Sequence, residues 1–276
     1  MAMTRRWSEI RSRLVIFEDE DLLVLNKPAG LSVMGSPEEP DLVTLAREAG
    51  EDLKPAHRID KVTTGAILLA KSAAAHAGLA RQFAHRSLDK SYLAITGSYG
   101  LPPQGLIKLP LTVGRKNRVR VAAQRSSIVR NERGDHWYVE PSDVSTKAKS
   151  YPSVTTFATV WADEDKSLLV VRPMTGRRHQ IRVHLAWIGY PILGDPLFEK
   201  AAHGGSELSY LHAWRIAFDP VWSGGRRVEL EAQPGQDFWT PLRGRVPPVS
   251  LLDRARRLEE ELQRRFHSPA TSGDGP

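Results

Sequence analysis

Two short stretches of this 276-residue chain carry charged side chains beside apolar runs that should be buried. In PAHRIDKVTTGAILLAK, His57, Arg58 and Asp60 stand just before a strand-like run that starts at Gly65. A turn at the end of a buried strand can hold a carboxylate partly out of water, which makes Asp60 a candidate for chemistry. The structural alternative is a local pair between Arg58 and Asp60, with threonine hydroxyls stabilising the turn.

A second stretch, TGRRHQIRVHLAWIGYPILGDP, places cations among apolar residues. Residues 177–189 have the pattern of a helix that ends at a glycine. We expect this helix to carry Arg177, Arg178, His179, Arg182 and His184. Arg178 and Arg182 are four residues apart and should share a face. The alternative is a helix with one solvated basic side, which composition alone does not exclude.

Several other kinds of site are disfavoured. The chain has no cysteine, which excludes disulfides, thiolate metal sites and cysteine nucleophiles. His179 and His184 are five residues apart, not the four of a helical metal pair, and no GxSxG motif is present. The segment GAILLAKS (65–72) matches a phosphate-binding P-loop except for Ala70, and its continuous apolar run favours a strand instead.

The charge balance favours an anionic partner. The chain has 39 Lys and Arg against 32 Asp and Glu, a formal net charge of +7, and 28 of the cations are Arg. The planar guanidinium suits phosphates and stacked bases. Seven basic residues fall in 19 positions that hold one acid, Glu132: Arg115, Lys116, Arg118, Arg120, Arg125, Arg130 and Arg133. This stretch predicts contacts with nucleic-acid phosphates, although a solvated loop or hairpin can have the same composition.

The order of elements predicts an α+β fold. Residues 14–17 and 21–26 should form a hairpin, and residues 65–70 a buried strand. Residues 72–87 should form a helix capped by Ser72, followed by another strand from 90. The runs SVTTFATVW and SLLVVRP should form a second hairpin. Strand pairs joined by short turns argue against a doubly wound parallel sheet.

The remaining segments bear on domain organisation. We expect residues 115–150 to be a mobile insertion, residues 249–266 to form an amphipathic helix packed on the body, and residues 267–276 to be a disordered tail. The helix should bury Leu251, Ala255, Leu258 and Leu262. The catalytic body should then span residues 1–248. No signal peptide or run of 18 apolar residues is found, so we expect a cytoplasmic protein with no membrane contact.

The motif HRIDKVTTGAILLAK closely resembles the HRLDxxTSG signature of the RluA-type pseudouridine synthases, with Ile59 for Leu and Thr64 for Ser. Four more segments resemble family blocks and follow the family's order: NKPAGLSV (26–33), DKSYLAITG (89–97), GRRHQIRVHL (176–185) and GYPILGDPLF (189–198). Five blocks in order are far more specific than any one. The resemblance covers roughly residues 14–240 and implies a bent, mainly antiparallel mixed sheet flanked by helices and loops.

The resemblance implies three catalytic residues. Asp60 matches the aspartate that attacks the target uridine, at the ribose or at the base. Tyr92 matches the tyrosine that stacks on the flipped base and helps to remove the C5 proton. Arg182 matches the arginine that pairs with the aspartate and holds it ionised and oriented. The isomerisation needs no redox agent, metal or nucleotide, so no cofactor is expected.

The resemblance also implies residues that contact RNA. Arg58 matches the arginine that enters the RNA stack in place of the extruded base, and Leu211 matches an apolar pocket residue. Lys27 lies in a family block and is assigned to the RNA-binding set. Arg178 replaces the usual Thr, which adds charge near the cleft. We further expect neutralisation of Arg118 and Arg120 to weaken RNA binding, and unchanged binding at low and high salt would refute this.

These residues and the resemblance predict an RNA pseudouridine synthase that acts on a tRNA or ribosomal RNA stem-loop. Because strands begin by residue 14, we expect the N-terminal RNA-binding domain of some ribosomal-RNA members to be missing. No heptad seam points beyond a monomer. Two alternatives remain: a non-catalytic RNA-binding or ribosome-assembly protein on the same fold, and an unrelated small-molecule enzyme. Intact Asp60, Tyr92 and Arg182 argue against the first.

Overall fold

A computed structural model describes residues 6–35, 39–97, 100–114, 117–199, 208–242, 244 and 247–266. In these ranges one mixed sheet contains β1 (Val15–Glu18), β2 (Leu22–Lys27), β3 (Lys54–Pro55), β4 (Thr64–Ala70), β5 (Asp89–Thr96), β6 (Gln104–Lys108), β9 (Val129–Arg130), β10 (His136–Tyr138), β12 (Val154–Ala162), β13 (Ser167–Pro173), β14 (Leu211–Phe218) and β15 (Val228–Glu231). A smaller sheet contains β7 (Leu111–Val113), β8 (Val119–Val121) and β11 (Ser150–Tyr151). The helices are α1 (Trp7–Leu14), α2 (Leu42–Glu48), α3 (Ala73–His85), α4 (Gln180–Trp187) and α5 (Pro248–Phe266). Short 3-10 turns occur at Arg125–Ser127, Pro141–Asp143 and Gln236–Leu242.

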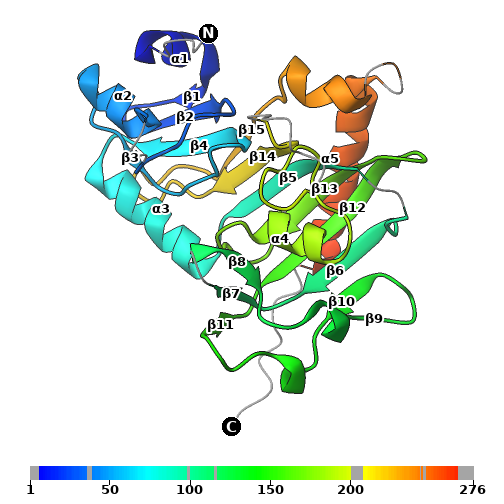
Figure 1. Ribbon diagram of the computed structural model, residues 1–276. Coiled ribbons are helices and arrows are strands. Elements are labelled where there is room, and N and C mark those ends of the chain that lie inside the picture. Colours follow the sequence, from blue (N-terminus) through cyan, green and yellow to red (C-terminus); the bar gives the residue numbers. More distant parts are fainter. Residues whose placement is uncertain are drawn as a thin grey trace.

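The main sheet is bent and mainly antiparallel, with the order β1-β2-β4-β14-β5-β13-β12-β6-β10-β9 (Figure 1). The pairs β14–β4 and β10–β6 are parallel, and the other pairs are antiparallel. β14 follows β13 and α4 in the chain but inserts between β4 and β5. It therefore joins an N-terminal half, built on β2 and β4, to a C-terminal half, built on β5, β13 and β12. The predicted α+β class is confirmed.

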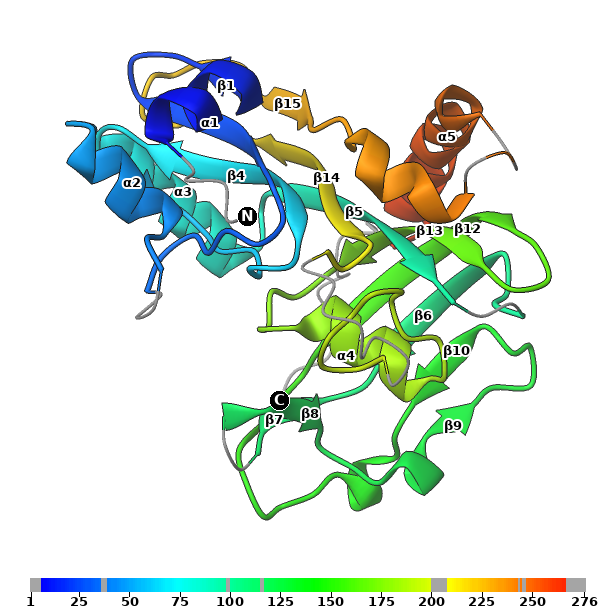
Figure 2. The ribbon, with the colours of Figure 1, turned by 45° about the horizontal axis from the view of Figure 1, so that its top comes forward.

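Each half of the sheet is covered on both faces. In the N-terminal half, α1 and α2 pack on one face of β2 and β4, and α3 packs on the other. In the C-terminal half, α4 and the small sheet lie on one face, and α5 lies on the opposite face (Figure 2). The alternation along β2 explains this: Leu23 and Leu25 face the first layer, while Leu22 and Val24 face α3.

Most of the elements expected from the sequence are found near their predicted bounds. β1 and β2 form the first hairpin, and β12 and β13 form the second. α3 begins after Ser72, whose hydroxyl accepts a hydrogen bond from the Ala75 amide, so the predicted N-cap is confirmed. The P-loop-like segment GAILLA forms most of β4, which pairs with β2 along its whole length and with β14 at its start, so it leaves no open loop for a nucleotide phosphate.

Two expectations about local structure are wrong. The helix expected over 177–189 is α4, which begins only at Gln180 because His179 adopts a left-handed backbone with φ of 55°. Arg177 and Arg178 therefore precede the helix, and Arg178 does not share a helical face with Arg182. Gln180 through Ala186 are all buried, which also removes the alternative of a helix with one solvated basic side.

The described residues of the 115–150 segment are not an unstructured insertion. They form β8, β9 and β10 and bury Val119, Val121 and Trp137 in the core around α4. Its pattern was missed because the strands have only two or three residues each. Arg115 and Lys116 lie outside the described residues.

The C-terminal helix is present as α5 and packs on the sheet through Leu251, Leu252, Ala255 and Leu262. Leu258 is partly buried against the same core. The tail expected from residue 267 lies outside the described residues, and the boundary at 248 remains a prediction. Among the described helices, none has the length and apolar character needed to cross a membrane.

Candidate active site

A cleft of about 520 Å³ opens where the two halves of the sheet meet. Its walls come from the loop between β3 and β4, from Tyr92 on β5, from Leu211 on β14 and from the segment that leads into α4. Asp60 and Arg182 both line it, although they are 122 positions apart in the chain. The fold therefore brings together the two charged stretches that the sequence singled out.

The centre of the cleft is a chain of two carboxylates joined by one guanidinium. Arg182 Nη1 donates to Asp60 Oδ2 at 2.6 Å. Its Nε and Nη2 donate to Asp195 Oδ2 and Oδ1 at 2.7 and 2.8 Å. Arg182 and Asp195 are buried, while the Asp60 side chain is 25 % exposed to the cleft. Burial opposes the charge on Arg182, but hydrogen bonds and the charges of both carboxylates raise its pKa, so the guanidinium stays protonated.

Asp195 is a functional candidate that the sequence analysis missed. It follows Gly194 in the GYPILGDPLF block, and this position was the only available signal. Its Oδ1 also accepts the amides of Leu197 and Phe198 at 2.9 and 3.2 Å. With two fixed backbone donors and a two-point grip on the guanidinium, Asp195 sets the direction in which Arg182 reaches Asp60.

The loop that carries Asp60 is fixed by close backbone packing at Gly65. Gly65 has φ of 108°, and a Cβ at this position would lie 2.2 Å from the Ala213 carbonyl oxygen on β14. Only glycine allows β4 and β14 to approach in this way. Upstream, His57 Nε2 accepts the Leu68 amide at 3.1 Å, and its ring stacks on Phe83. Burial, with a smaller effect of Lys90, lowers the pKa of His57 to about 3, so it serves as a neutral acceptor.

Lys27 fixes the same loop from the other side. Its ammonium donates to the carbonyls of Pro28 and Leu31 at 2.8 Å each and to that of Lys61 at 3.3 Å. Because the residue is 1 % exposed, its charge is unavailable to a phosphate outside. The prediction that Lys27 binds RNA is therefore wrong, and the residue instead ties the NKPAG turn to the residue after Asp60.

Two further ionisable side chains, His179 and Tyr92, interact with the charge of Asp60. His179 Nε2 lies 3.5 Å from Asp60 Oδ1, and burial lowers the pKa of His179 despite this carboxylate. Tyr92 lines the cleft, where burial and the charge of Asp60 raise the pKa of its phenol well above the usual range. Both groups are therefore neutral near pH 7. A neutral phenol ring suits stacking on a base better than proton removal.

The other predicted RNA contacts fall into two groups. Arg58 is exposed, Arg178 is half-buried and Leu211 is 4 % exposed, and all three line the cleft. Arg178 also donates to the Asn117 carbonyl and to its Oδ1. Arg118 and Arg120 are exposed on and next to β8, outside the cleft lining. They follow Asn117, so Arg178 connects the cleft to this basic segment.

His184, although it lies in the basic cluster, belongs to the core. One ring nitrogen contacts Thr155 Oγ1 and the other contacts the Leu109 carbonyl oxygen, both at 2.9 Å. Burial lowers its pKa to about 4, although the bond to Leu109 opposes this. Within the described residues, no group of three or more His, Asp or Glu side chains is placed to hold a metal ion.

Comparisons with known proteins define the class. Residues 21–187 match the family model described as RNA pseudouridylate synthase. The chain is 34 % identical over 246 residues to a Zymomonas mobilis protein named ribosomal large subunit pseudouridine synthase D, covering 81 % of this chain and 70 % of that relative. It is 31 % identical over 189 residues to the dual-specificity RNA pseudouridine synthase RluA of Escherichia coli K12, covering 67 % of this chain and 76 % of that relative.

A solved human structure, RNA Pseudouridylate Synthase Domain Containing 4, shares the fold. It aligns with a TM-score of 0.65 at 24 % identity, over 91 % of this chain and 95 % of that chain. The chain belongs to the RNA pseudouridylate synthase family and is an RluA-type RNA pseudouridine synthase, an isomerase. The resemblance found from the five sequence blocks is thus confirmed.

Proposed function

We propose that the cleft isomerises a uridine in a stem-loop of tRNA or ribosomal RNA, with Asp60 as the nucleophile. The observation that supports this most is a partly exposed carboxylate held by a buried guanidinium at the base of a cation-lined cleft. Isomerisation breaks the N1–C1′ bond, turns the uracil and joins C5 to C1′. Any bond that Asp60 forms to the ribose or the base breaks again before product release. The proton that C5 loses passes to water and N1 takes one from water, so bonds and protons balance without a redox partner or a metal.

The target base has to leave its stack before Asp60 can reach it. Extrusion costs a few kcal/mol and is cheapest in a loop, which favours a stem-loop substrate. Tyr92 stacks on the extruded uracil, Leu211 forms an apolar wall beside it, and Arg58 fills the place that it leaves in the RNA. Arg58 supports this role because it is exposed and stands two residues before Asp60.

Attraction for the RNA comes from the cations around the cleft. Arg178 lines the cleft and contacts Asn117, and exposed Arg118 and Arg120 extend the positive charge beyond it. Neutralising Arg118 and Arg120 together should weaken binding and flatten its salt dependence, because the slope falls by about one unit for each phosphate that the protein no longer neutralises. We propose that the enzyme acts as a monomer in the cytoplasm, where such RNAs are available.

Tritium release from RNA labelled at C5 of uridine tests the proposal, with total tRNA and total ribosomal RNA assayed separately. Wild-type protein should release tritium from one or both pools, and Asp60→Asn should release none while it still binds RNA. Asp165→Asn is the matched control, because Asp165 is an exposed acid in the turn between β12 and β13. Binding without release by the wild type would favour the non-catalytic alternative.

A further inference from the structure

A second, smaller pocket of about 220 Å³ lies directly beside the catalytic cleft. Phe83, Lys90 and Arg177 belong to the walls of both, together with Pro173, Thr175 and Gly176. The pocket is bounded by the end of α3, the start of β5 and the end of β13. A strand of RNA that enters the catalytic cleft can therefore continue over this side pocket.

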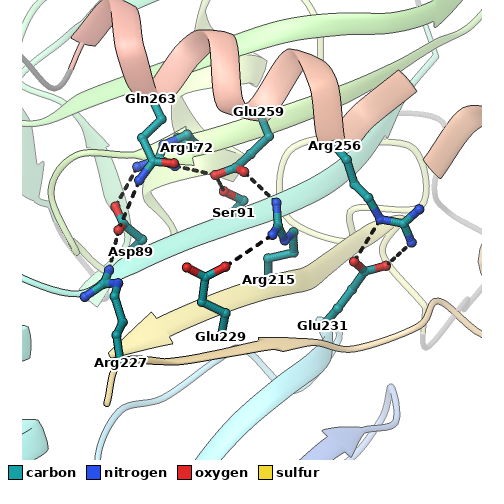
Figure 3. A network of polar contacts seen from close by, with 10 residues as sticks. All are labelled: Asp89, Ser91, Arg172, Arg215, Arg227, Glu229, Glu231, Arg256, Glu259 and Gln263. Carbon is teal, nitrogen blue, oxygen red and sulfur yellow. Dashed lines mark hydrogen bonds and ion pairs between the residues drawn. The ribbon is translucent and has the colours of Figure 1, made fainter. Parts of the chain in front are cut away.

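The side pocket is strongly cationic. Four basic residues line it against one acid: Arg86, Lys90, Arg172 and Arg177 against Asp89. The acid is already engaged, since Arg172 and Arg227 donate to its two oxygens at 2.7 and 2.5 Å. Arg172 is likewise engaged by Glu259 on α5. Figure 3 shows these contacts between β5 and α5, on the face of β5 that carries Asp89 and Ser91.

The opposite face of β5 carries the cation without a counter-charge. Lys90 alternates with Asp89 and Ser91 and shares its face with Tyr92, two residues on, about 7 Å along the strand. Within the described ranges, the Lys90 ammonium has no ion pair or hydrogen bond with protein. A Cβ at residue 176 would lie 3.1 Å from Lys90 Nζ, so Gly176 leaves the ammonium its space.

Among the described residues, Arg177 likewise has no anionic partner. Arg177 Nε is buried without a hydrogen-bond partner, and its guanidinium stacks over the Tyr151 ring with its carbon 5.0 Å from the centroid. Burial, followed by the charge of Arg86, lowers the pKa of Lys90 to about 8. A partly desolvated group of cations of this kind gains stability from an anion that enters between them.

We propose that this side pocket, built by Lys90, Arg86 and Arg177, binds a backbone phosphate of the substrate RNA close along the strand to the extruded uridine. The proposal rests on the proposed function, since it assumes that the base stacks on Tyr92. A phosphate held one step along β5 from Tyr92 fixes the position of the strand, so the uridine reaches Asp60 in a defined register.

Salt-dependent binding of labelled total tRNA and total ribosomal RNA tests the pocket, with wild type, Lys90→Gln and Lys166→Gln compared. Lys166 lies in the turn at the far end of β13 and pairs with Asp165, so its replacement by Gln removes the same charge at a place away from the cleft. Lys90→Gln should flatten the plot of log K against log salt by about 0.7 to 0.9, which corresponds to about fivefold weaker binding at 0.15 M salt. Lys166→Gln should match wild type.

An independent variant and a protection measurement complete the test. Arg86→Gln changes an exposed cation and should also flatten the slope. Trace acetylation read by mass spectrometry should modify Lys90 in the free enzyme, and either RNA pool should protect it more than Lys166. Protection by inorganic phosphate alone, without protection by RNA, would mean that the pocket binds small anions and would overturn the assignment to RNA.

The pocket and the proposed function fail in different ways. If wild type releases tritium and binds RNA, but Lys90→Gln has an unchanged slope, the side pocket is not a phosphate site and the proposed function stands. If Lys166→Gln weakens RNA binding as much as Lys90→Gln, the effect comes from the net charge of the protein, and the pocket proposal is also overturned. Absence of both release and RNA binding in wild type overturns the two together.

Discussion

Replacement of Asp195 by Asn tests whether the buried guanidinium has to be held in place for catalysis. Asp195 is fully buried and accepts two hydrogen bonds from Arg182 at 2.7 and 2.8 Å. Asn has the same shape but offers one oxygen, so its amide NH₂ must face either Arg182 Nε, or Arg182 Nη2 together with the backbone amides of Leu197 and Phe198. In either orientation, the NH₂ group of the Asn side chain therefore faces another hydrogen-bond donor.

The expected loss can be scaled from this geometry. Removing one partner of a buried ion pair costs about 3 to 5 kcal/mol, and we expect about 3 kcal/mol because Asn keeps one acceptor. Arg182 would lose its fixed direction, and a shift of about 1 Å at Asp60 can reduce a rate by about 100-fold. Because Asp195 does not line the cleft, RNA affinity should be unchanged.

Urea unfolding and single-turnover tritium release measure the two effects separately, with Asp165→Asn as the exposed control. The expected result for Asp195→Asn is a lower free energy of unfolding, a rate about 100-fold lower and an unaltered RNA dissociation constant. A variant with stability within about 1 kcal/mol and a rate within about threefold of wild type would refute the reasoning, since the structure gives Arg182 no other buried acceptor on Nε.

Three further predictions concern the scaffold. Glu259→Gln removes the buried charge and one of the two oxygens that Arg172 and Arg215 contact, although Arg172 keeps Asp89. It should lower the free energy of unfolding by about 3 kcal/mol in urea, whereas the exposed neighbour Glu260→Gln should change little. Gly65→Ala should destabilise far more than Gly50→Ala in the same assay, because both have positive φ but only the first meets a backbone oxygen; equal losses would contradict the close-packing account. His184 has a pKa lowered from 6.5 to about 4, so only the unfolded chain takes up its proton, and stability should fall by about 1.4 kcal/mol per pH unit between pH 6.5 and 4. The slope measured between pH 6 and 5 should be shallower by that amount in His184→Gln, and an identical slope would show that this histidine is not buried neutral.

Local patterns predicted the elements whose signals are local. Short apolar runs on either side of an acidic turn predicted both hairpins, and Ser72 marked the start of α3. The start of α4 could not be predicted, because a left-handed conformation at His179 has no sequence signal comparable to glycine. Lys27 was misassigned for a related reason. A buried lysine whose ammonium donates to three backbone carbonyls cannot be distinguished from an exposed lysine by sequence alone.

Glu259 shows a signal that was present and not used. It stands four residues after Ala255 and three before Leu262, so it belongs to the apolar stripe that packs α5 on the sheet. A charge in such a stripe requires a partner. The partners, Arg172 on β13 and Arg215 on β14, come from strands that only the folded topology brings under the helix (Figure 3). A sequence can thus indicate that a buried charge is paired without identifying the pair.

The arrangement of charge in the catalytic centre follows from the nature of the substrate. A carboxylate nucleophile in a cleft for RNA would repel phosphates if its charge were not compensated. Arg182 donates to Asp60 from below, and Asp195 holds that guanidinium from the far side, away from the cleft. We propose that the cations on the walls, including Arg58 and Lys90, attract the strand. The N-terminal half supplies Asp60, the proposed nucleophile, and the C-terminal half supplies its partner Arg182, so the site forms only when β14 has joined the two halves of the sheet.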